Sequence, residues 1–277
     1  MPSVADPATG RLPSEQTSNG CFETMRAYGG RIFRLEQHLD RLKASAQTLG
    51  LSDMVDRRQL AVALIAQLKN SGLPDAIVRI ALMPQRVAGD HLPTRVQPSI
   101  VVQPLQLPPE RAYRQGISVA VVPTKKFPIS MIDPQVKYSA RMSSVMALTE
   151  AHLRGVEEAL FLDALGSVTE STASNFGLIH DGALLTPPCW LGLLSGITRD
   201  VLCELARDLH LPMREVPLTR HEVYSAQEAF LTSTIKEVLP VTVVDGRTIG
   251  TGRPGPVTKR LRRAFQELVR RELKLKR

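Results

Sequence analysis

EEALFLDALGSVTESTASNFGLIHDGALLTPP, residues 157–188, contains three short apolar runs separated by small and polar residues. Runs of this length, bounded by Gly, Asp and Ser, predict strands at 158–162, 176–180 and 183–185. Between the first two runs, Glu170 is the one acidic residue in a series of small polar residues, SVTESTASN. It is either an ordinary loop acid or a functional carboxylate at the end of a short strand.

Strands and helices extend from this stretch in both directions and fall into two blocks. The first block predicts a hairpin of strands at 21–28 and 31–33, helices at 35–49 and 57–70, and strands at 76–83 and 99–103. The second block predicts a strand at 117–122, helices at 141–153 and 198–209, strands at 229–232 and 241–244, and a closing helix at about 257–274. The expected fold class is α+β, with two domains that cover residues 1–112 and 113–277.

Composition places the chain among globular proteins and leaves one charge anomaly. Of its 277 residues, 43% are hydrophobic and 22% are charged, which excludes a disordered or fibrous protein. The net charge of +8 is concentrated in residues 259–277, which hold nine basic and two acidic side chains. This segment is either a nucleic-acid-binding surface or the solvated face of an amphipathic helix. We favour the helix face and expect no nucleic-acid partner.

Several other kinds of site find no support in the sequence. Cys21, Cys189 and Cys203 form no Cys-x-x-Cys pair, and the six histidines lack metal-ligand spacing. No apolar run approaches the roughly 20 residues that a membrane span needs. We therefore expect a cytoplasmic protein with no metal and no membrane partner.

Two basic residues are candidates for chemistry. Arg41 lies at the edge of the predicted 35–49 helix, where it is either a solvated arginine or an anion ligand. Lys137 ends a proline-containing loop between Val136 and Tyr138. Desolvation there favours a nucleophilic amine, and an ordinary surface lysine is the alternative.

Two further segments could bind an anion. Residues 195–200, SGITRD, open a predicted helix whose first N–H groups suit a phosphate, although a simple helix cap is as common. Residues 232–234, Thr-Ser-Thr, place three hydroxyl groups at the end of a predicted strand.

Taken in order, these segments resemble the class IV (fold-type IV) pyridoxal-phosphate enzymes, which include branched-chain aminotransferases, D-amino-acid aminotransferases and 4-amino-4-deoxychorismate lyases. The resemblance spans residues 21–265 and is carried by CFETMRAYGGRIFRLEQHLDRL, VKYSARM, EEALFLDALGSVTESTASNFGLIHDGALLTPP, LSGITRDVLCELA, EAFLTSTIKEVLPV and GRPGPVTKRLRRAF. It implies a small α/β N-terminal domain, a larger mixed-sheet, barrel-like C-terminal domain and a homodimer. The implied cofactor is pyridoxal 5'-phosphate.

The resemblance also implies roles for individual residues. Lys137 matches the lysine that forms a Schiff base with the cofactor and then moves the substrate proton. Glu170 matches the acid that faces the pyridine nitrogen and keeps it protonated. The residues that match the phosphate site are Arg41, Ile197, Thr198 and Thr234.

The substrate is less tightly constrained by the resemblance. Phe22, Tyr28 and Ser233 are expected at the substrate pocket, and Arg79 matches a position that can meet a dicarboxylate donor such as glutamate. We favour a transaminase for branched-chain or similar apolar L-amino acids with 2-oxoglutarate. A 4-amino-4-deoxychorismate lyase, which eliminates pyruvate, and a D-amino-acid aminotransferase remain as alternatives.

Overall fold

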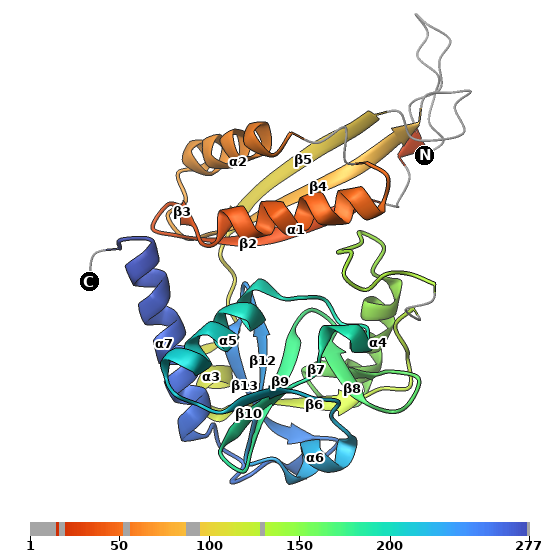
Figure 1. Cartoon of the computed structure of the whole chain (residues 1–277), viewed down its shortest axis with the longest axis vertical. Coiled ribbons are helices and arrows are strands. Elements are labelled where there is room, and N and C mark those ends of the chain that lie inside the picture. Colours follow the sequence, from red (N-terminus) through yellow and green to blue (C-terminus); the bar gives the residue numbers. More distant parts are fainter. Residues whose placement is uncertain (1–14, 17–19, 52–55, 87–94, 128–130, 276–277) are drawn as a thin grey trace, which may run out of the picture. The chain divides into compact units, whose positions relative to one another are not determined.

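The protein forms two compact units in a computed structural model that describes residues 15–16, 20–51, 56–86, 95–127 and 131–275 (Figure 1). The first unit comprises Met1–Pro104 and Val136–Ala140, and the second comprises Leu105–Gln135 and Arg141–Arg277. The expected boundary after residue 112 differs from this division in two ways. Helix α3 (Glu110–Gln115) lies in the second unit, and residues 136–140 return to the first because they pair with the start of its sheet.

The first unit is an antiparallel sheet with two helices. Its strands are β1 (Glu15–Gln16), β2 (Cys21–Tyr28), β3 (Arg31–Ile32), β4 (Ala76–Arg86) and β5 (Arg95–Pro104), and its helices are α1 (Leu35–Thr48) and α2 (Arg57–Ser71). Strand β4 pairs with β2 and β5, and β3 continues from β2 through a turn at Gly29 and Gly30. Both glycines have positive φ angles, 53° and 75°, which side chains disfavour.

Alternation along β2 separates a helix-covered face from the opposite face. Cys21, Met25 and Ala27 are buried in one apolar cluster with Leu39 and Leu42 of α1. The intervening residues of β2 point to the opposite face, because successive side chains of a strand alternate.

The second unit contains a closed ring of strands. Its strands are β6 (Ile117–Val121), β7 (Glu158–Leu162), β8 (Val168–Ser171), β9 (Asn175–His180), β10 (Ala183–Thr186), β11 (Met213–Glu215), β12 (Glu228–Ser233), β13 (Glu237–Val244) and β14 (Arg247–Thr248). Strands pair in the order β9, β12, β13, β6, β7 and β8, and β8 pairs again with β9. The pairing closes a barrel, and the expected α+β class with a barrel-like second domain is confirmed.

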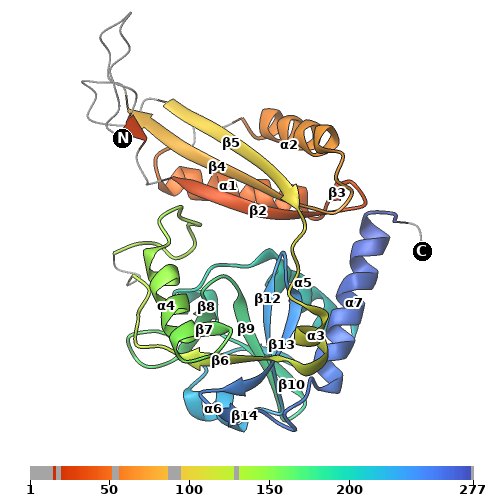
Figure 2. The same cartoon turned by 180° about the vertical axis from the view of Figure 1, so that it is seen from behind.

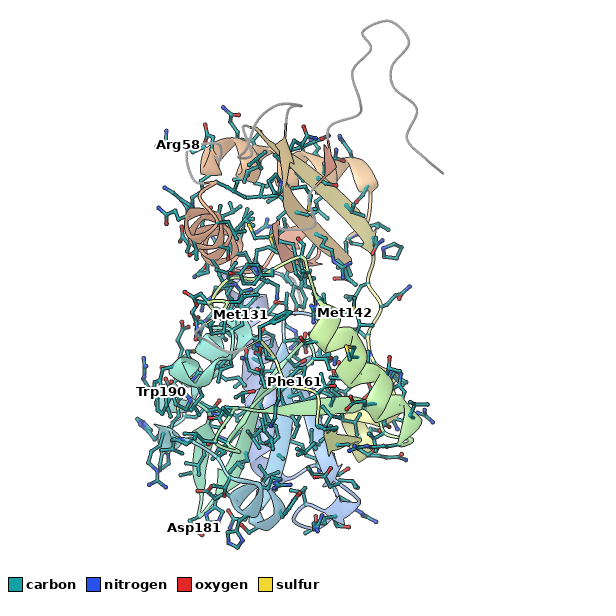
Figure 3. All side chains as sticks on the ribbon, turned by 90° about the vertical axis from the view of Figure 1, so that its right-hand side faces the viewer. Arg58, Met131, Met142, Phe161, Asp181 and Trp190 are labelled. Carbon is teal, nitrogen blue, oxygen red and sulfur yellow. The ribbon has the colours of Figure 1, made fainter. Side chains whose placement is uncertain are left out.

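Helices cover this barrel from several sides. Helix α4 (Met142–Leu153) packs against β7, α5 (Ile197–Asp208) against β12, and α7 (Pro256–Glu272) against β13 (Figure 2). A short helix, α6 (Arg220–Ser225), lies near β9. Phe161 of β7 is 1% exposed, whereas Met142 and Trp190 lie at the surface (Figure 3).

The basic C-terminal segment forms the amphipathic helix expected from the sequence. On α7, Leu261, Phe265 and Leu268 are buried, while Lys259 and Arg263 are exposed. Among the described residues, none of the helices is both long enough and apolar enough to cross a membrane.

A buried carboxylate fastens α1 to β2 in the first unit. Glu23 lies on the helix-covered face of β2, and its side chain is 1% exposed. Arg41 donates to it from Nε at 2.6 Å and from a terminal nitrogen at 2.9 Å. His38, one turn earlier on the same helix, lies with Nδ1 2.8 Å from the second oxygen. A charge removed from water is stable only when it is paired in this way.

The two titratable groups of this network have lowered pKa values. Burial alone would raise the pKa of Glu23, but the charge of Arg41 and the hydrogen bonds from His38 and Arg41 outweigh it and hold that pKa well below its ordinary value of 4.5. Burial lowers the pKa of His38 below 6.5, against the opposing effect of Glu23. His38 is therefore neutral at neutral pH and donates from Nδ1 to Glu23.

These shifts predict how acid destabilises the first unit. The stabilising contribution of His38 is present above pH 6.5 and is lost as the pH falls below that value. The contribution of Glu23 is present above pH 4.5 and declines at lower pH, by up to about 1.4 kcal/mol per pH unit. Glu23→Gln should remove this second loss, and at pH 7 it should cost about 3 kcal/mol because Arg41 loses its buried partner.

Urea unfolding at pH 7 to 3, followed by pulsed amide exchange in α1 peptides, measures this effect. Glu36→Gln is the matched control, because Glu36 lies on the same helix with its side chain 63% exposed. An equal loss of stability below pH 4.5 in the wild type and in Glu23→Gln would contradict the prediction.

Candidate active site

Lys137 is held against the first unit by its own backbone. Its N–H donates to the hydroxyl of Ser45 on α1 at 3.3 Å, and its carbonyl accepts from the N–H of Phe22 at 3.0 Å. The next residue, Tyr138, forms an antiparallel bridge with Cys21. The ammonium nitrogen of Lys137 lies 5.1 Å from the centre of the Phe22 ring. The lysine is thus anchored at the start of β2, beside α1.

Arg41 lies on the same helix, one turn before the serine that anchors Lys137. Glu23 holds its guanidinium through two nitrogens, and 14% of its side chain remains exposed. Both Arg41 and Lys137 contribute to the lowered pKa of His38, so both charges lie close to this imidazole. The structure therefore brings the two predicted basic site residues together around one buried network.

The face of the first sheet opposite its helices carries the predicted substrate residues. Phe22 and Tyr28 alternate with the buried residues of β2, and Arg79 of β4 lies directly opposite Thr24. Directly opposed residues share a face in an antiparallel pair, so these side chains belong to one surface. Arg79 is exposed, while Tyr28 is buried beneath the guanidinium of Arg26, 4.1 Å from its ring centre.

Glu170 lies in the second unit, near the end of β8. It pairs across the hairpin with Asn175 of β9, and its side chain is 11% exposed. One carboxylate oxygen, Oε1, accepts from the ammonium of Lys126. The other, Oε2, accepts from the Asn175 amide and from the N–H of Leu194, both at 3.2 Å. The carboxylate is thus held in one orientation.

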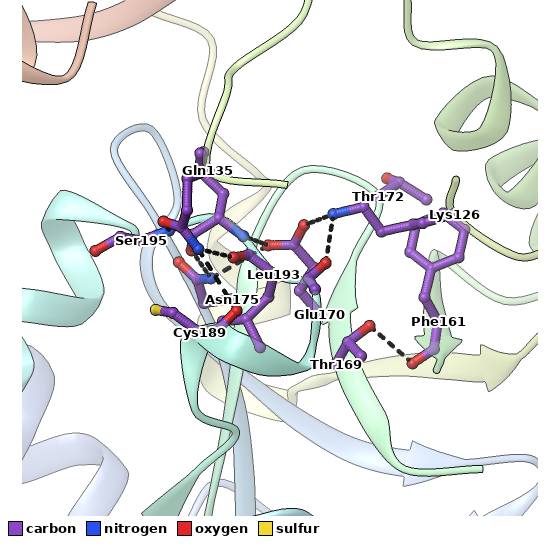
Figure 4. Close-up of polar contacts among 12 residues, drawn as sticks. Lys126, Gln135, Phe161, Thr169, Glu170, Thr172, Asn175, Cys189, Leu193 and Ser195 are labelled. Atoms are coloured by element: carbon purple, nitrogen blue, oxygen red, sulfur yellow. Dashed lines mark hydrogen bonds and ion pairs between the residues drawn. The ribbon is translucent and has the colours of Figure 1, made fainter. Parts of the chain in front are cut away.

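The loop before α5 is tied to this carboxylate by several side chains (Figure 4). Asn175 also donates to the carbonyl of Leu194 at 2.8 Å. Gln135 donates to the carbonyl of Leu193 at 2.8 Å and accepts from the N–H of Ser195 at 3.1 Å. A Cβ atom at Gly196 would lie 1.8 Å from the Asn175 side-chain oxygen, so the close approach requires glycine there.

Helix α5 begins immediately after this loop. Its first residues, Ile197 and Thr198, are buried, and among the described residues no side chain caps this end. The first N–H groups of a helix have no partner within the helix. They therefore remain available to an anion, which the helix dipole also favours.

The predicted hydroxyl groups lie at the end of β12. Thr232 pairs with Asn175 of the neighbouring strand, and its buried hydroxyl has no hydrogen-bond partner among the residues that the structure describes. Ser233 accepts from the N–H of Lys236 at 3.2 Å. Thr234 follows in the turn to β13. The start of α5 lies near Thr232, because Asn175 pairs with Thr232 and its side chain lies against Gly196.

The three thiols take no part in this chemistry. Burial raises the pKa of Cys21 to about 12 and that of Cys203 to about 11, and it also raises the pKa of Cys189. All three remain protonated at neutral pH, so none is an activated nucleophile. Within the described ranges, no three His, Cys, Asp or Glu side chains gather where they could hold a metal ion.

Each unit therefore gathers part of the predicted set. The first unit holds Phe22, Tyr28, Arg41, Arg79 and Lys137, and the second holds Glu170, Ile197, Thr198, Ser233 and Thr234. Among the side chains that hydrogen-bond to these residues, sequence reasoning assigned no role to Ser45, Lys126 and Asn175. Asn175 was visible in the SVTESTASN run, but Lys126 follows Lys125 in a loop without any distinguishing spacing.

Known proteins match this chain in both sequence and overall fold. The chain is 34% identical to the branched-chain-amino-acid aminotransferase of Pseudomonas aeruginosa, over 90% of this chain and 84% of that protein. The crystal structure of the Escherichia coli branched-chain amino acid aminotransferase matches with a TM-score of 0.87 and 31% identity, over 91% of this chain and 86% of that one. The T.th. branched-chain amino acid aminotransferase complexed with N-(5'-phosphopyridoxyl)-L-glutamate matches with a TM-score of 0.84 and 30% identity, over 91% and 85%.

A family model supplies the assignment. The model of amino-transferase class IV matches residues 20–244, which include both groups of site residues described above. The sequence resemblance is thereby confirmed: the chain belongs to the class IV aminotransferases, enzymes that depend on pyridoxal phosphate.

Proposed function

We propose that this protein holds pyridoxal 5'-phosphate and transfers an amino group from a branched-chain or similar apolar L-amino acid to a 2-oxo acid such as 2-oxoglutarate. One observation carries the proposal. Lys137 and Arg41, far apart in the sequence, are fixed by β2 and α1 around the same buried network. An amine and a guanidinium so held suit the aldehyde and the phosphate of this cofactor.

The polar groups of the second unit also fit the cofactor. Its phosphate suits the uncapped start of α5 at Ile197 and Thr198, and Thr234 follows the end of β12, where Thr232 pairs with Asn175. The buried Thr232 hydroxyl lacks a partner among the described residues, as expected where a polar ligand completes the bonding. Arg41 would add charge-assisted hydrogen bonds to the phosphate.

Lys137 and Glu170 would perform the central chemistry. When bound, pyridoxal phosphate supplies a ring that takes up the electron pair left at the substrate Cα. Lys137 would hold the cofactor through Nζ, yield it to the incoming amino acid and then move the proton at Cα. Glu170 would face the ring nitrogen, because its carboxylate is fixed in one orientation and 11% of the side chain remains exposed.

The face of the first sheet opposite its helices supports an apolar substrate and a dicarboxylate partner. Phe22 supplies half-buried aromatic surface, Tyr28 lies on the same face beneath Arg26, and Arg79 supplies an exposed guanidinium. An arginine in this position suits the second carboxylate of 2-oxoglutarate or glutamate. The matching T.th. structure is complexed with a phosphopyridoxyl derivative of L-glutamate, which agrees with this proposal.

We also propose a homodimer that works in the cytoplasm. On α4, Met142, Val145 and Met146 are 66%, 60% and 52% exposed, and they lie on one side of the helix. A contiguous apolar surface of this kind is typical of an interface between subunits.

A panel of amino donors tests the proposed reaction. Purified protein supplied with pyridoxal phosphate should convert 2-oxoglutarate to glutamate with L-leucine, L-isoleucine or L-valine, and much more slowly with the D-enantiomers. Activity with D-amino acids alone would favour a D-amino-acid aminotransferase. Release of pyruvate from 4-amino-4-deoxychorismate without an amino acceptor would favour the lyase, and either result would contradict the proposal.

Substitution of Arg79 tests the dicarboxylate site. Arg79→Met should raise the KM for 2-oxoglutarate at least about tenfold, because a charge-assisted hydrogen bond is lost. The KM for 4-methyl-2-oxopentanoate, which has no second carboxylate, should stay unchanged. Arg58→Met is the control, since Arg58 is an exposed arginine of α2 in the same unit. Equal changes for both oxo acids would contradict the assignment.

A further inference from the structure

Lys126 is a partly buried partner of Glu170 that the proposed mechanism does not yet use. It lies in the segment after β6, and its side chain is 28% exposed. Its ammonium donates to Oε1 of Glu170 and to the carbonyl of Gly192 at 3.2 Å (Figure 4). The lysine thus joins the carboxylate to the beginning of the loop that leads into α5.

The hydrogen bonds of Glu170 are those of an ionised carboxylate. Its partners among the described residues are Lys126, Asn175 and the N–H of Leu194, and all three are donors. A carboxylate has about four acceptor positions, whereas a protonated carboxyl group must donate one bond. With two bonds on Oε2 and one on Oε1, an acceptor position remains on Oε1. One further N–H donor would fill the fourth acceptor position of the carboxylate.

We propose that Lys126 is the positioning residue that keeps the proton on the ring nitrogen of bound pyridoxal phosphate, by holding Glu170 ionised and in one orientation. This inference rests on the proposed function, in which Glu170 faces that nitrogen. Lys126 acts through the carboxylate and need not touch the cofactor.

The physical reason is a competition for one proton. In a partly buried pair, the proton between a pyridine nitrogen and a carboxylate can lie on either group, and low polarity favours the neutral pair. A cation hydrogen-bonded to the carboxylate stabilises its negative charge and so leaves the proton on the nitrogen. The neutral donors from Asn175 and Leu194 contribute in the same direction with less strength.

The chain offers a matched control for this lysine. Lys125, the preceding residue, has the same charge, but its ammonium donates to the backbone carbonyl of Asp163 at 3.3 Å and lies at an exposed site. Lys125→Met therefore removes one positive charge from the same loop without altering the partners of Glu170.

Ring-¹⁵N-labelled pyridoxal phosphate bound to each protein provides the direct measurement. The ¹⁵N chemical shift distinguishes a protonated from a neutral ring nitrogen. The wild type, Lys125→Met and Lys126→Arg should give the protonated shift. Lys126→Met should move the signal toward the neutral value and weaken cofactor binding about tenfold in a fluorescence titration.

Two further measurements separate the proposal from a structural role. Lys126→Gln keeps a hydrogen-bond donor but removes the charge, so it should move the nitrogen signal as Lys126→Met does while preserving the thermal stability of the cofactor-free protein. If Lys126→Met does not fold, Lys126→Gln decides the question. A protonated signal and wild-type affinity in the folded Lys126 variants would overturn the proposal. Failure of the wild type to bind the cofactor would instead overturn the proposed function, and this inference with it.

Discussion

A buried carboxylate is stable only when hydrogen-bond donors replace the water that it has lost. Each unit of the protein contains such a carboxylate. In the first unit, Glu23 of β2 accepts hydrogen bonds from Arg41 and His38 of α1. In the second unit, Glu170 accepts hydrogen bonds from Lys126, from Asn175 and from the N–H of Leu194 in the loop before α5. Within each unit, the carboxylate fixes the cationic and N–H groups that surround it.

The hydrogen bonds around Glu170 require a glycine at position 196. Because Asn175 bonds both Glu170 and the carbonyl of Leu194, its side chain fills the space where a Cβ of residue 196 would lie. The chain can enter α5 there only without a side chain. With glycine at this position, no side chain caps the start of α5 within the described structure.

The sequence predicts the long elements better than the short ones and the supporting side chains. Apolar periodicity locates α1 and α7, and the ordered motifs predict Arg41, Lys137 and Glu170 as candidate site residues. The shortest elements, α3 and β14 among them, have too few residues to show a period and were not predicted. Lys126 was missed because its role depends on a carboxylate 44 positions away in the sequence, which only the folded chain brings close. The structure gathers the candidate residues within each unit, and their roles toward the cofactor remain the proposal.

The central claim is that Lys137 is the residue that binds pyridoxal phosphate covalently. The most direct measurement is borohydride reduction of the protein with its cofactor, followed by peptide mapping by mass spectrometry. The account predicts one phosphopyridoxyl group, on the peptide that contains Lys137, and none after Lys137→Ala. Attachment at another lysine, such as Lys126, or no attachment in the wild type would contradict it.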